Sequence, residues 1–287
     1  MKVCILPQAA SFQARDGGVY RVIEALERHL PEYGVEIVPE RDADVVHGHA
    51  IVQWDESRPS VYTNHGIFAE PFESDWQRWA RDVMLHSLTI ANVVTSVSRW
   101  ATFEYAHLGR DVRVIPNGVD CDALRPGTPQ GYVLWGKVNL NKPCLVGCRA
   151  ALRLAAVTPR TQFVFTLVPD EAIPPNVRVI GKQSHPDMLK WMAGADVYLS
   201  TTKENCSVQV LEAMALGVPV LGLPGGGIDE TEGPLAVDDL AEGLRALQEH
   251  RGLFSESCLR LARRKYDWGR IIPRYIECYE DARKGES

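Results

Sequence analysis

Two glutamates, Glu204 and Glu212, stand on either side of a short polar loop and the start of an apolar helix. The pattern around them predicts a strand at 197–200, then the loop, the helix and a second strand at 218–221. A helix that begins directly after a strand points its N-terminal N–H groups and its positive dipole end above the sheet, where they favour an anion such as a diphosphate. An ionised glutamate only accepts hydrogen bonds, so carboxylates at such a place indicate hydroxyl groups. Diphosphate and hydroxyls together describe a nucleotide-sugar.

Two lysines provide the matching positive charge. Lys137 and Lys142 follow a strand predicted at 132–135, and ligands of open α/β sheets bind beyond the carboxyl ends of strands. Two ammonium groups could hold a diphosphate and stabilise it as a leaving group without a metal ion. The alternative is a pair of solvated loop lysines.

Further candidates lie at the boundaries of predicted elements. Ser207 and the neighbouring N–H groups could donate to a diphosphate, and Gly17 and Gly18 could let backbone approach phosphate at a helix start, although a simple turn explains these glycines equally well. Glu212 lies inside an otherwise apolar helix, where a carboxylate needs hydrogen-bond donors. A ribose diol would supply two donors, and the alternative is a salt bridge to a lysine or arginine.

The elements that must position these residues alternate between strand and helix patterns. In the first half we predict strands near 3–6, 35–38, 44–47, 61–63, 93–97 and 112–115, and helices after Gly18 and at 74–90 and 98–107. A turn-rich linker spans 117–131, after which the alternation restarts. We therefore expect an α/β protein of two Rossmann-like domains facing a cleft. The first covers 1–125 and receives the acceptor, with a final helix of about 269–287 that can pack back on it, and the second covers 131–268 and binds the nucleotide-sugar.

Composition excludes several classes of protein. The chain has 287 residues, 45% of them apolar, and a net charge of −6, which argues against non-specific nucleic-acid binding. It contains no apolar run long enough to span a membrane and no secretory leader pattern. Seven cysteines without paired spacing favour a reducing, cytoplasmic setting. His47 and His49 have a metal-like spacing but no third ligand, so we expect no metal site.

Several short segments follow one another along the chain: Asp16-Gly17-Gly18, Val45-Val46-His47-Gly48-His49, Tyr62-Thr63-Asn64-His65-Gly66, Thr95-Ser96-Val97-Ser98, Val114-Ile115-Pro116-Asn117-Gly118-Val119-Asp120, Gly136-Lys137 with Lys142, and Glu204 to Pro219. In this order they resemble the retaining glycosyltransferase family 4, also called glycosyl transferases group 1, which has the GT-B fold. The resemblance covers nearly the whole chain. It implies transfer of a sugar from a nucleotide-sugar, UDP- or GDP-linked, to an acceptor hydroxyl with retention of configuration and without a cofactor.

The resemblance also implies roles for individual residues. It places Glu204 against the donor sugar and its developing positive charge, Glu212 on the ribose, and His65 beside the donor sugar and the acceptor. The expected catalytic residues are Glu204, His65 and Lys142. The expected donor-binding residues are Lys137, Lys142, Glu204, Asn205, Cys206, Ser207, Glu212, Gly17 and Gly18.

One departure keeps other functions open. The family often has Glu-Gly-Phe-Gly where this chain has Glu204-Asn205-Cys206-Ser207. A nucleotide-sugar epimerase or hydrolase on the same fold, or a non-catalytic sugar-nucleotide-binding protein, therefore remains as an alternative. The acceptor could be a glycan, a lipid or a small molecule, with a modified nucleic-acid base ranked below these, and a peripheral contact with a membrane also stays open.

Trp76, Trp79 and Val83 follow helical spacing on a segment that also carries Arg78 and Arg81. Such a stripe could form an acceptor platform or touch a membrane. An aromatic stripe at this spacing is more often part of a core, and that is the interpretation we favour.

Overall fold

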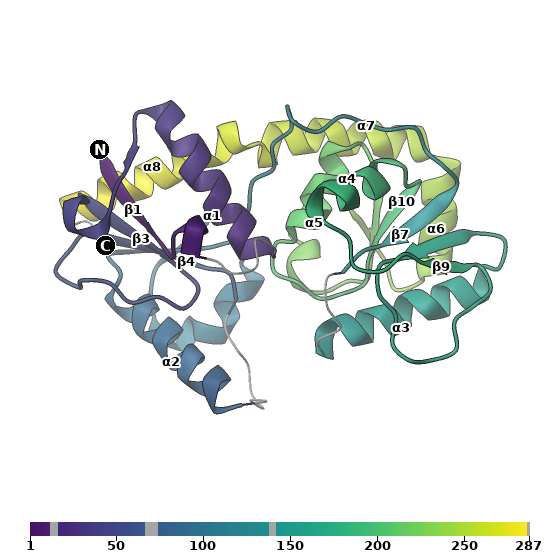
Figure 1. Ribbon diagram of the computed structural model, residues 1–287, viewed down its shortest axis with the longest axis horizontal. Helices are drawn as coiled ribbons and strands as arrows, with labels where there is room; N and C mark the ends of the chain where they lie inside the picture. Colours follow the sequence, from purple (N-terminus) through teal and green to yellow (C-terminus); the bar gives the residue numbers. More distant parts are fainter. Residues whose placement is uncertain (12–16, 67–73, 138–141, 286–287) are drawn as a thin grey trace. The chain divides into compact units, whose positions relative to one another are not determined.

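The computed structural model describes residues 1–11, 17–66, 74–137 and 142–285, except for the side chains of Lys142 and Pro143. The chain divides into two compact units. Unit 1 is Met1–Gly118 together with Trp268–Ser287, and unit 2 is Val119–Asp267. Each unit contains one parallel sheet of six strands with helices on both faces (Figure 1). The α/β fold of two Rossmann-like domains expected from the sequence is confirmed.

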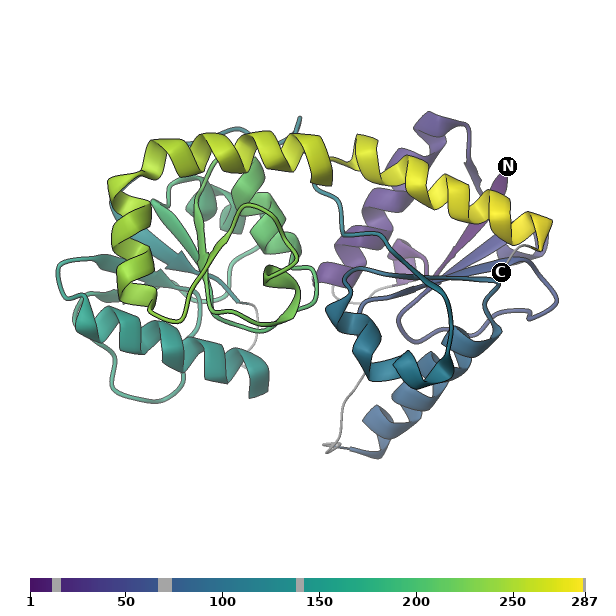
Figure 2. The same cartoon turned by 180° about the vertical axis from the view of Figure 1, so that it is seen from behind.

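Unit 1 has the strand order β2-β1-β3-β4-β5-β6. The strands are β1 (Lys2–Leu6), β2 (Glu36–Ile37), β3 (Val45–His49), β4 (Ser60–Asn64), β5 (Val93–Ser96) and β6 (Val112–Val114). Helices α1 (Gly18–His29) and α8 (Trp268–Lys284) cover one face, and α2 (Asp75–Ile90) with the 3-10 segment η4 (Trp100–Leu108) covers the other (Figures 1 and 2). Short 3-10 turns lie at Ala9–Ser11, Leu30–Tyr33 and Glu40–Asp42.

Alternation along the central strands explains how both faces of this sheet are filled. Val46 and Tyr62 pack with Leu88 of α2 in one apolar cluster. The neighbouring residue His47 points to the other face, where it meets Tyr279 of α8. Because helices cover both faces, β3 and β4 are buried along their whole length, as expected for central parallel strands.

Unit 2 has the strand order β12-β11-β10-β7-β8-β9. Its strands are β7 (Tyr132–Trp135), β8 (Gln162–Phe165), β9 (Val177–Val179), β10 (Val197–Ser200), β11 (Val220–Gly222) and β12 (Leu235–Ala236). Its helices are α3 (Lys142–Val157), α4 (His185–Ala193), α5 (Val208–Ala215), α6 (Leu240–Glu249) and α7 (Arg251–Leu261), with a 3-10 turn at Gly226–Ile228 and a π-helical turn at Ala262–Tyr266. Residues of α3 and α6 form one core with the sheet residues Val133, Trp135, Phe163, Phe165, Val197, Leu199 and Leu221.

Strand order places a switch in chain direction within each sheet. In unit 2, the chain moves from β7 outward to β8 and β9, then returns to place β10 on the other side of β7. In unit 1, β1 lies between β2 and β3 in the same way. At such switch points the loops that leave two neighbouring strands diverge to opposite faces, which opens a crevice at the carboxyl ends of the strands.

The expected strands and helices occur close to the expected positions, with two corrections. The helix expected at 98–107 is a 3-10 segment at Trp100–Leu108, interrupted where Tyr105 has φ −130°. Strand β12, which has two residues, was not predicted. In the part of the chain that the structure describes, no helix combines the length and apolarity needed to cross a bilayer.

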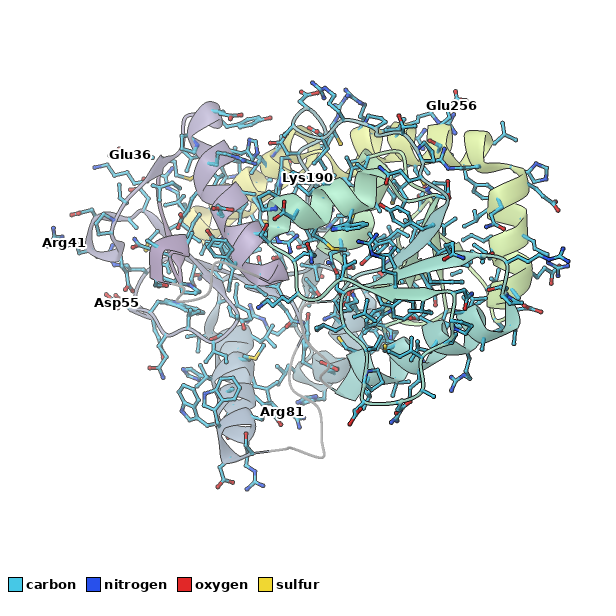
Figure 3. All side chains as sticks on the ribbon, turned by 45° about the vertical axis from the view of Figure 1, so that its right-hand side comes forward. Glu36, Arg41, Asp55, Arg81, Lys190 and Glu256 are labelled. Atoms are coloured by element: carbon cyan, nitrogen blue, oxygen red, sulfur yellow. The ribbon has the colours of Figure 1, made fainter. Side chains whose placement is uncertain are left out.

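The core interpretation of the stripe on α2 is wrong for its two tryptophans. Trp76 and Trp79 are 55% and 53% exposed, whereas Val83 is buried. Arg81 projects from the same helix (Figure 3). Val83 and Leu88, in later turns of α2, are buried, and Leu88 belongs to the core of unit 1. The two tryptophans lie in the first turns of the helix, which this core does not cover. The acceptor-platform and membrane interpretations therefore remain for these two residues.

Candidate functional site

A buried ion pair lies at the switch point of unit 2. Lys137 Nζ is 2.6 Å from Glu204 Oε1. Lys137 follows β7 and Glu204 follows β10, and these two strands are neighbours in the sheet. The lysine side chain is 5% exposed and the glutamate side chain 33% exposed. The structure thus brings together two residues singled out in the sequence and leaves the carboxylate the more accessible of the pair.

Both groups of the pair are held in their charged forms. Burial by itself would lower the pKa of Lys137, but the negative charge of Glu204 and the hydrogen bond to it outweigh burial and raise that pKa. Burial would raise the pKa of Glu204, but the charge of Lys137 and hydrogen bonds from Lys137 and Ser207 keep it below its usual value. The crevice therefore holds an ammonium and a carboxylate at neutral pH.

Polar neighbours fix the position of the lysine. Its backbone N–H donates to Thr166 Oγ1 at 2.8 Å, and the Thr166 hydroxyl donates to the Lys137 carbonyl at 2.7 Å. Its ammonium lies 3.5 Å from Gln209 Oε1, which also accepts from the Tyr198 hydroxyl at 3.2 Å. Gln209 and Tyr198 were not singled out in the sequence. Gln209 lies on α5 and Glu204 in the loop before it, and the packing of α5 on β10 brings both side chains to the same lysine.

The N-terminus of α5 lies beside the Lys137–Glu204 pair. Ser207 is the N-cap residue of α5, yet its side chain makes no capping bond to that helix. Its hydroxyl bonds instead to the Glu204 carboxylate. The first N–H groups of α5 therefore have no cap from Ser207, and a helix end of this kind suits an anion. Of the other two predicted donor-binding residues in this loop, Cys206 is buried and Asn205 is partly buried.

A glycine turn after β11 supports the loop that carries Glu204. The N–H of Gly227 donates to the Glu204 carbonyl at 2.7 Å. A Cβ at Gly227 would lie 1.0 Å from the carbonyl oxygen of Asn205. No side chain fits there, so two loops from neighbouring strands can touch backbone to backbone only because position 227 is glycine.

Glu212 has a partner that the sequence did not indicate. Its side chain is 7% exposed, and its Oε1 lies 2.7 Å from Nε2 of His185, the first residue of α4. The sequence offered a lysine or arginine as the alternative to ribose, and the structure provides a histidine. Ser184 and Pro186 mark a helix start at 185, but nothing in the sequence indicates that this helix lies against α5.

Three histidines gather in unit 1 at the carboxyl ends of β3 and β4. His47 bonds to Tyr279 at 2.8 Å and to Thr63 at 2.7 Å. His49 Nδ1 lies 3.0 Å from His65 Nε2, and the rings of His47 and His49 are 4.1 Å apart. Among the described residues, no group of three His, Cys, Asp or Glu side chains is arranged to hold a metal ion.

These histidines are neutral at pH 7. Burial, followed by the charge of His65, lowers the pKa of His47 to about 3. Burial lowers the pKa of His65 to about 4. Burial and the two neighbouring histidines lower the pKa of His49 well below its usual value. His65, predicted to be catalytic, can therefore act as an uncharged hydrogen-bonding group.

The remaining predicted residues lie at two helix starts. Gly17, with φ 97°, precedes α1, and Gly18 is its first residue. A Cβ at Gly17 would meet nothing within 4 Å, so the backbone angle rather than crowding favours glycine there. Asp16, the first residue of that motif, lies outside the described residues. Lys142 begins α3, but its side chain lies outside the described part of the chain.

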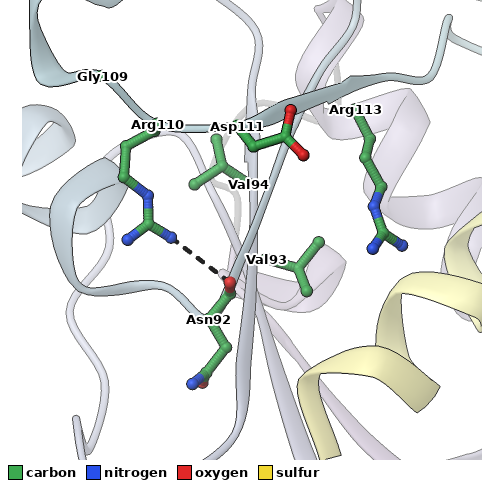
Figure 4. A pocket seen from close by; sticks show the side chains of 7 residues that line it. All are labelled: Asn92, Val93, Val94, Gly109, Arg110, Asp111 and Arg113. Atoms are coloured by element: carbon green, nitrogen blue, oxygen red, sulfur yellow. Dashed lines mark hydrogen bonds between the residues drawn. The ribbon is translucent and has the colours of Figure 1, made fainter. Parts of the chain in front are cut away.

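A cavity of about 210 Å³ lies elsewhere in unit 1, lined by Asn92, Val93, Val94, Gly109, Arg110, Asp111 and Arg113 (Figure 4). It borders the amino-terminal ends of β5 and β6, opposite to the edge with the histidines. Arg110 donates there to the carbonyls of Thr89, Ala91 and Asn92. Arg110 thus caps the end of α2, a structural task.

Two family models match the chain. Residues 20–123 match the model described as Glycosyltransferase Family 4. Residues 147–250 match the model described as Glycosyl transferases group 1. No curated protein sequence matches the chain significantly.

Solved structures resemble the chain along almost its whole length. The glycosyltransferase AviGT4, involved in avilamycin A biosynthesis, is 21% identical with a TM-score of 0.71, over 99% of this chain and 98% of that one. A sucrose-phosphate synthase from Thermosynechococcus elongatus is 15% identical with a TM-score of 0.76, over 98% of each chain. Anabaena HepE in complex with UDP-glucose is 17% identical with a TM-score of 0.68, over 98% of this chain and 100% of that one. At these identities the likeness shows a common fold.

We predict that the neutral histidines make unit 1 sensitive to acid. Each has a lower pKa when folded than the ordinary 6.5, so below about pH 6.5 the unfolded chain binds more protons. The free energy of unfolding should therefore fall between pH 7 and pH 5, by roughly 2 kcal/mol for each histidine that stays neutral. Denaturant titrations at both values measure this. The free energy of unfolding of His47→Gln should fall less between pH 7 and pH 5 than that of wild type. For a control variant at the exposed His107, it should fall as much as for wild type. If the free energy of unfolding depended equally on pH in all three proteins, the assignment of His47 as a neutral buried histidine would be contradicted.

We also predict strong coupling between Lys137 and Glu204. Glu204→Gln leaves the buried ammonium without its countercharge, and Lys137→Met leaves the carboxylate without its own. Each single variant should lose less free energy of unfolding than the roughly 3–5 kcal/mol typical of breaking a fully buried pair, because Glu204 is partly exposed. The double variant should lose less than the two single losses added together. Denaturant unfolding of all four proteins gives the coupling energy, and strict additivity would show that the pair does not act as a unit.

Proposed function

Because the chain belongs to the GT-B glycosyltransferases of the family 4 type, we propose that it moves a sugar from a UDP- or GDP-linked donor to an acceptor hydroxyl, with retention of anomeric configuration and without a metal ion. Of the relatives, HepE was solved with UDP-glucose, which supports a nucleotide-sugar as the donor. The acceptor is a glycan, a lipid or a small molecule, and a modified nucleic-acid base ranks below these.

The observation that carries this proposal is the Lys137–Glu204 pair at the head of α5. An ammonium has three N–H donors, so Lys137 can bond to Glu204, contact Gln209 and still direct one N–H to a phosphate oxygen. The first N–H groups of α5 add donors beside it. In this proposal Lys142, at the head of α3, contributes the second cation, and Asn205, Cys206 and Ser207 line the diphosphate.

Glu204 has the charge and exposure that a glycosyl transition state requires. Its carboxylate stays ionised, and one third of the side chain is accessible. We assign it to the positive charge that develops at the anomeric carbon as the bond to the diphosphate weakens. The Lys137 ammonium on its other side would stabilise the growing negative charge of the diphosphate. One ion pair would thus stabilise both the positive charge at the anomeric carbon and the negative charge on the leaving group.

Retention follows from a reaction on one face of the sugar. The bond between the anomeric carbon and the diphosphate oxygen breaks, and its electron pair leaves with the diphosphate. The acceptor oxygen bonds to the same face of that carbon, and its proton passes to an oxygen of the departing phosphate. In this scheme no side chain is needed as a nucleophile, and the lysines provide the charge that a metal ion would otherwise supply.

Unit 1 would contribute the acceptor side. The neutral His65 can donate or accept a hydrogen bond from a sugar or acceptor hydroxyl without bringing a charge. Gly17 and Gly18, at the start of α1, offer backbone that a ligand can approach closely. These assignments are proposals that rest on the family and on the polar groups gathered at this sheet edge.

We further propose that the protein works in the cytoplasm. All seven cysteines are buried and unbonded to one another. Unpaired thiols are the usual state in a reducing compartment.

A nucleotide-sugar screen tests the proposal. UDP- and GDP-sugars would be added to the protein and thermal unfolding followed, because a ligand at a hundred times its Kd stabilises the folded state by about 2.7 kcal/mol. The stabilising donor is then incubated with candidate acceptors, with and without EDTA. We expect a new glycoside with the donor's anomeric configuration by NMR, and an unchanged rate in EDTA. Free or epimerised sugar alone would reject transfer, an inverted product would reject retention, and a loss of rate in EDTA would reject metal independence.

Lys142→Ala should slow transfer, because it removes charge compensation from the leaving diphosphate. Loss of one such donor typically costs roughly a hundred- to a thousand-fold in kcat. Steady-state kinetics with the donor found above measure the effect. Lys190→Ala is the matched control, since it removes a lysine whose side chain is 77% exposed on α4. Equal kcat for Lys142→Ala and the control would reject the role of Lys142.

A further inference from the structure

His49, the last residue of β3, lies beside the predicted catalytic residue His65. In the register of β3 and β4, His49 pairs with Thr63, two residues before His65, so the three side chains leave the same face of the sheet. Nδ1 of His49 lies 3.0 Å from Nε2 of His65, and the two ring centres are 5.3 Å apart. The contact joins His65 to a buried residue that has no role in the proposed function.

The main chain directly after His49 is strained. Ala50 has φ 55° and is the one residue other than glycine with a positive φ in the described part of the chain. An L side chain disfavours this left-handed region because its Cβ crowds the following carbonyl, and such residues persist only where the surrounding structure holds them. Here the hydroxyl of Tyr62 on β4 donates to the Ala50 carbonyl at 2.5 Å. Strain of this kind is typical of places where a side chain must point in one direction.

His49 makes one hydrogen bond and leaves its second nitrogen without one. The residue is fully buried, and its Nε2 has no hydrogen-bond partner among the described residues. Such buried polar atoms are few in folded proteins. The nearby ring of His47, 4.1 Å away, does not help, because its two nitrogens bond to Tyr279 and Thr63. The contact with His65 is therefore the one polar contact that fixes the His49 ring.

The nitrogen without a partner decides which ring donates. Burial lowers the pKa of both histidines, so each is neutral and carries one N–H. If His65 donated to His49, the proton of His49 would be on Nε2, where a buried N–H would have no acceptor. Buried N–H groups without an acceptor are rarer in proteins than acceptors without a donor. His49 therefore donates from Nδ1 to Nε2 of His65, and the proton of His65 is on its own Nδ1.

We propose that His49 is a positioning residue that fixes the ring of His65 and holds it in the Nδ1–H form. The strained Ala50 and the hydroxyl of Tyr62 keep His49 in the direction that this requires. The inference adds to the proposed function a role for His49 and a proton at one atom of His65, which is then a hydrogen-bond donor at Nδ1. Its kinetic part rests on the proposed function, in which His65 lies beside the sugar and the acceptor.

NMR of the wild-type protein tests the proton positions directly. A ring nitrogen that carries a proton and one that does not have different nitrogen-15 shifts, and the chain has eight histidines to resolve. Spectra of His65→Gln and His49→Asn, each lacking one set of signals, assign the two rings. At neutral pH we expect a proton on Nδ1 and none on Nε2 in both His49 and His65. A proton on Nε2 of His65 overturns the inference.

Two variants of His49 test the positioning role. His49→Phe keeps a ring but removes the donor, so Nε2 of His65 should gain the proton in part or in full. The kcat for transfer should fall by about two- to ten-fold, the loss expected for one hydrogen bond between neutral groups, with a smaller change in KM. His49→Asn has an amide near the place of Nδ1 and should recover most of the kcat. His107→Phe, at an exposed histidine of η4, is the control and should match wild type.

A merely structural role would give another result. His49→Phe would then lower the midpoint of thermal unfolding while the proton position in His65 and the kcat stayed as in wild type, and that result also overturns the inference. An equal loss of kcat in His49→Phe and His49→Asn would reject the hydrogen bond as its cause. If the wild type transferred no sugar from any UDP- or GDP-linked donor, the proposed function would fail together with the kinetic part. The NMR spectra need no substrate and would still decide the hydrogen bond between His49 and His65.

Discussion

The candidate site depends on one ion pair across the switch point of a parallel sheet. Lys137 and Glu204 are far apart in the chain, and they meet because β10 returns to the free side of β7. The pair is costly to bury, so the fold surrounds it with partners: Gln209 and Ser207 satisfy the two charges from α5. Gly227 then lets the next loop close on the backbone of Glu204. Strand order, helix position and glycine placement in unit 2 thus act together to hold opposite charges at one sheet edge.

The two units place polar groups at equivalent edges but control charge in opposite ways. In unit 1 burial keeps His47, His49 and His65 neutral. In unit 2 the attraction within the Lys137–Glu204 pair overcomes burial and keeps both partners ionised. The described part of unit 2 thus offers a buried ammonium to a diphosphate, whereas the three buried histidines of unit 1 offer uncharged hydrogen-bonding groups. This division matches a reaction between a charged donor and an uncharged acceptor group.

The sequence predicted the strands and the long helices because each depends on a local pattern of apolar residues, such as the helical spacing of the buried residues in α1. It also led to Lys137 and Glu204, since both follow strands whose carboxyl ends can be read from the chain. Partner choice could not be predicted. His185 meets Glu212 because α4 packs beside α5, and that depends on sheet order. Trp76 and Trp79 are a second case in which the sequence pattern does not reveal tertiary contacts. Helical spacing defines a face of the helix, but the tertiary structure determines how much of that face is covered.

A histidine beside Glu212 holds the buried acid in a different way from a permanent cation. An arginine would form two parallel hydrogen bonds and occupy both carboxylate oxygens, and a lysine would bring a strongly hydrated charge. An imidazole N–H instead supplies the buried acid with one hydrogen bond. A buried carboxylate must have a hydrogen-bond donor to be stable, and His185 supplies one. Placing the donor on α4 and the acid on α5 lets the packing of two helices set the alignment of one hydrogen bond.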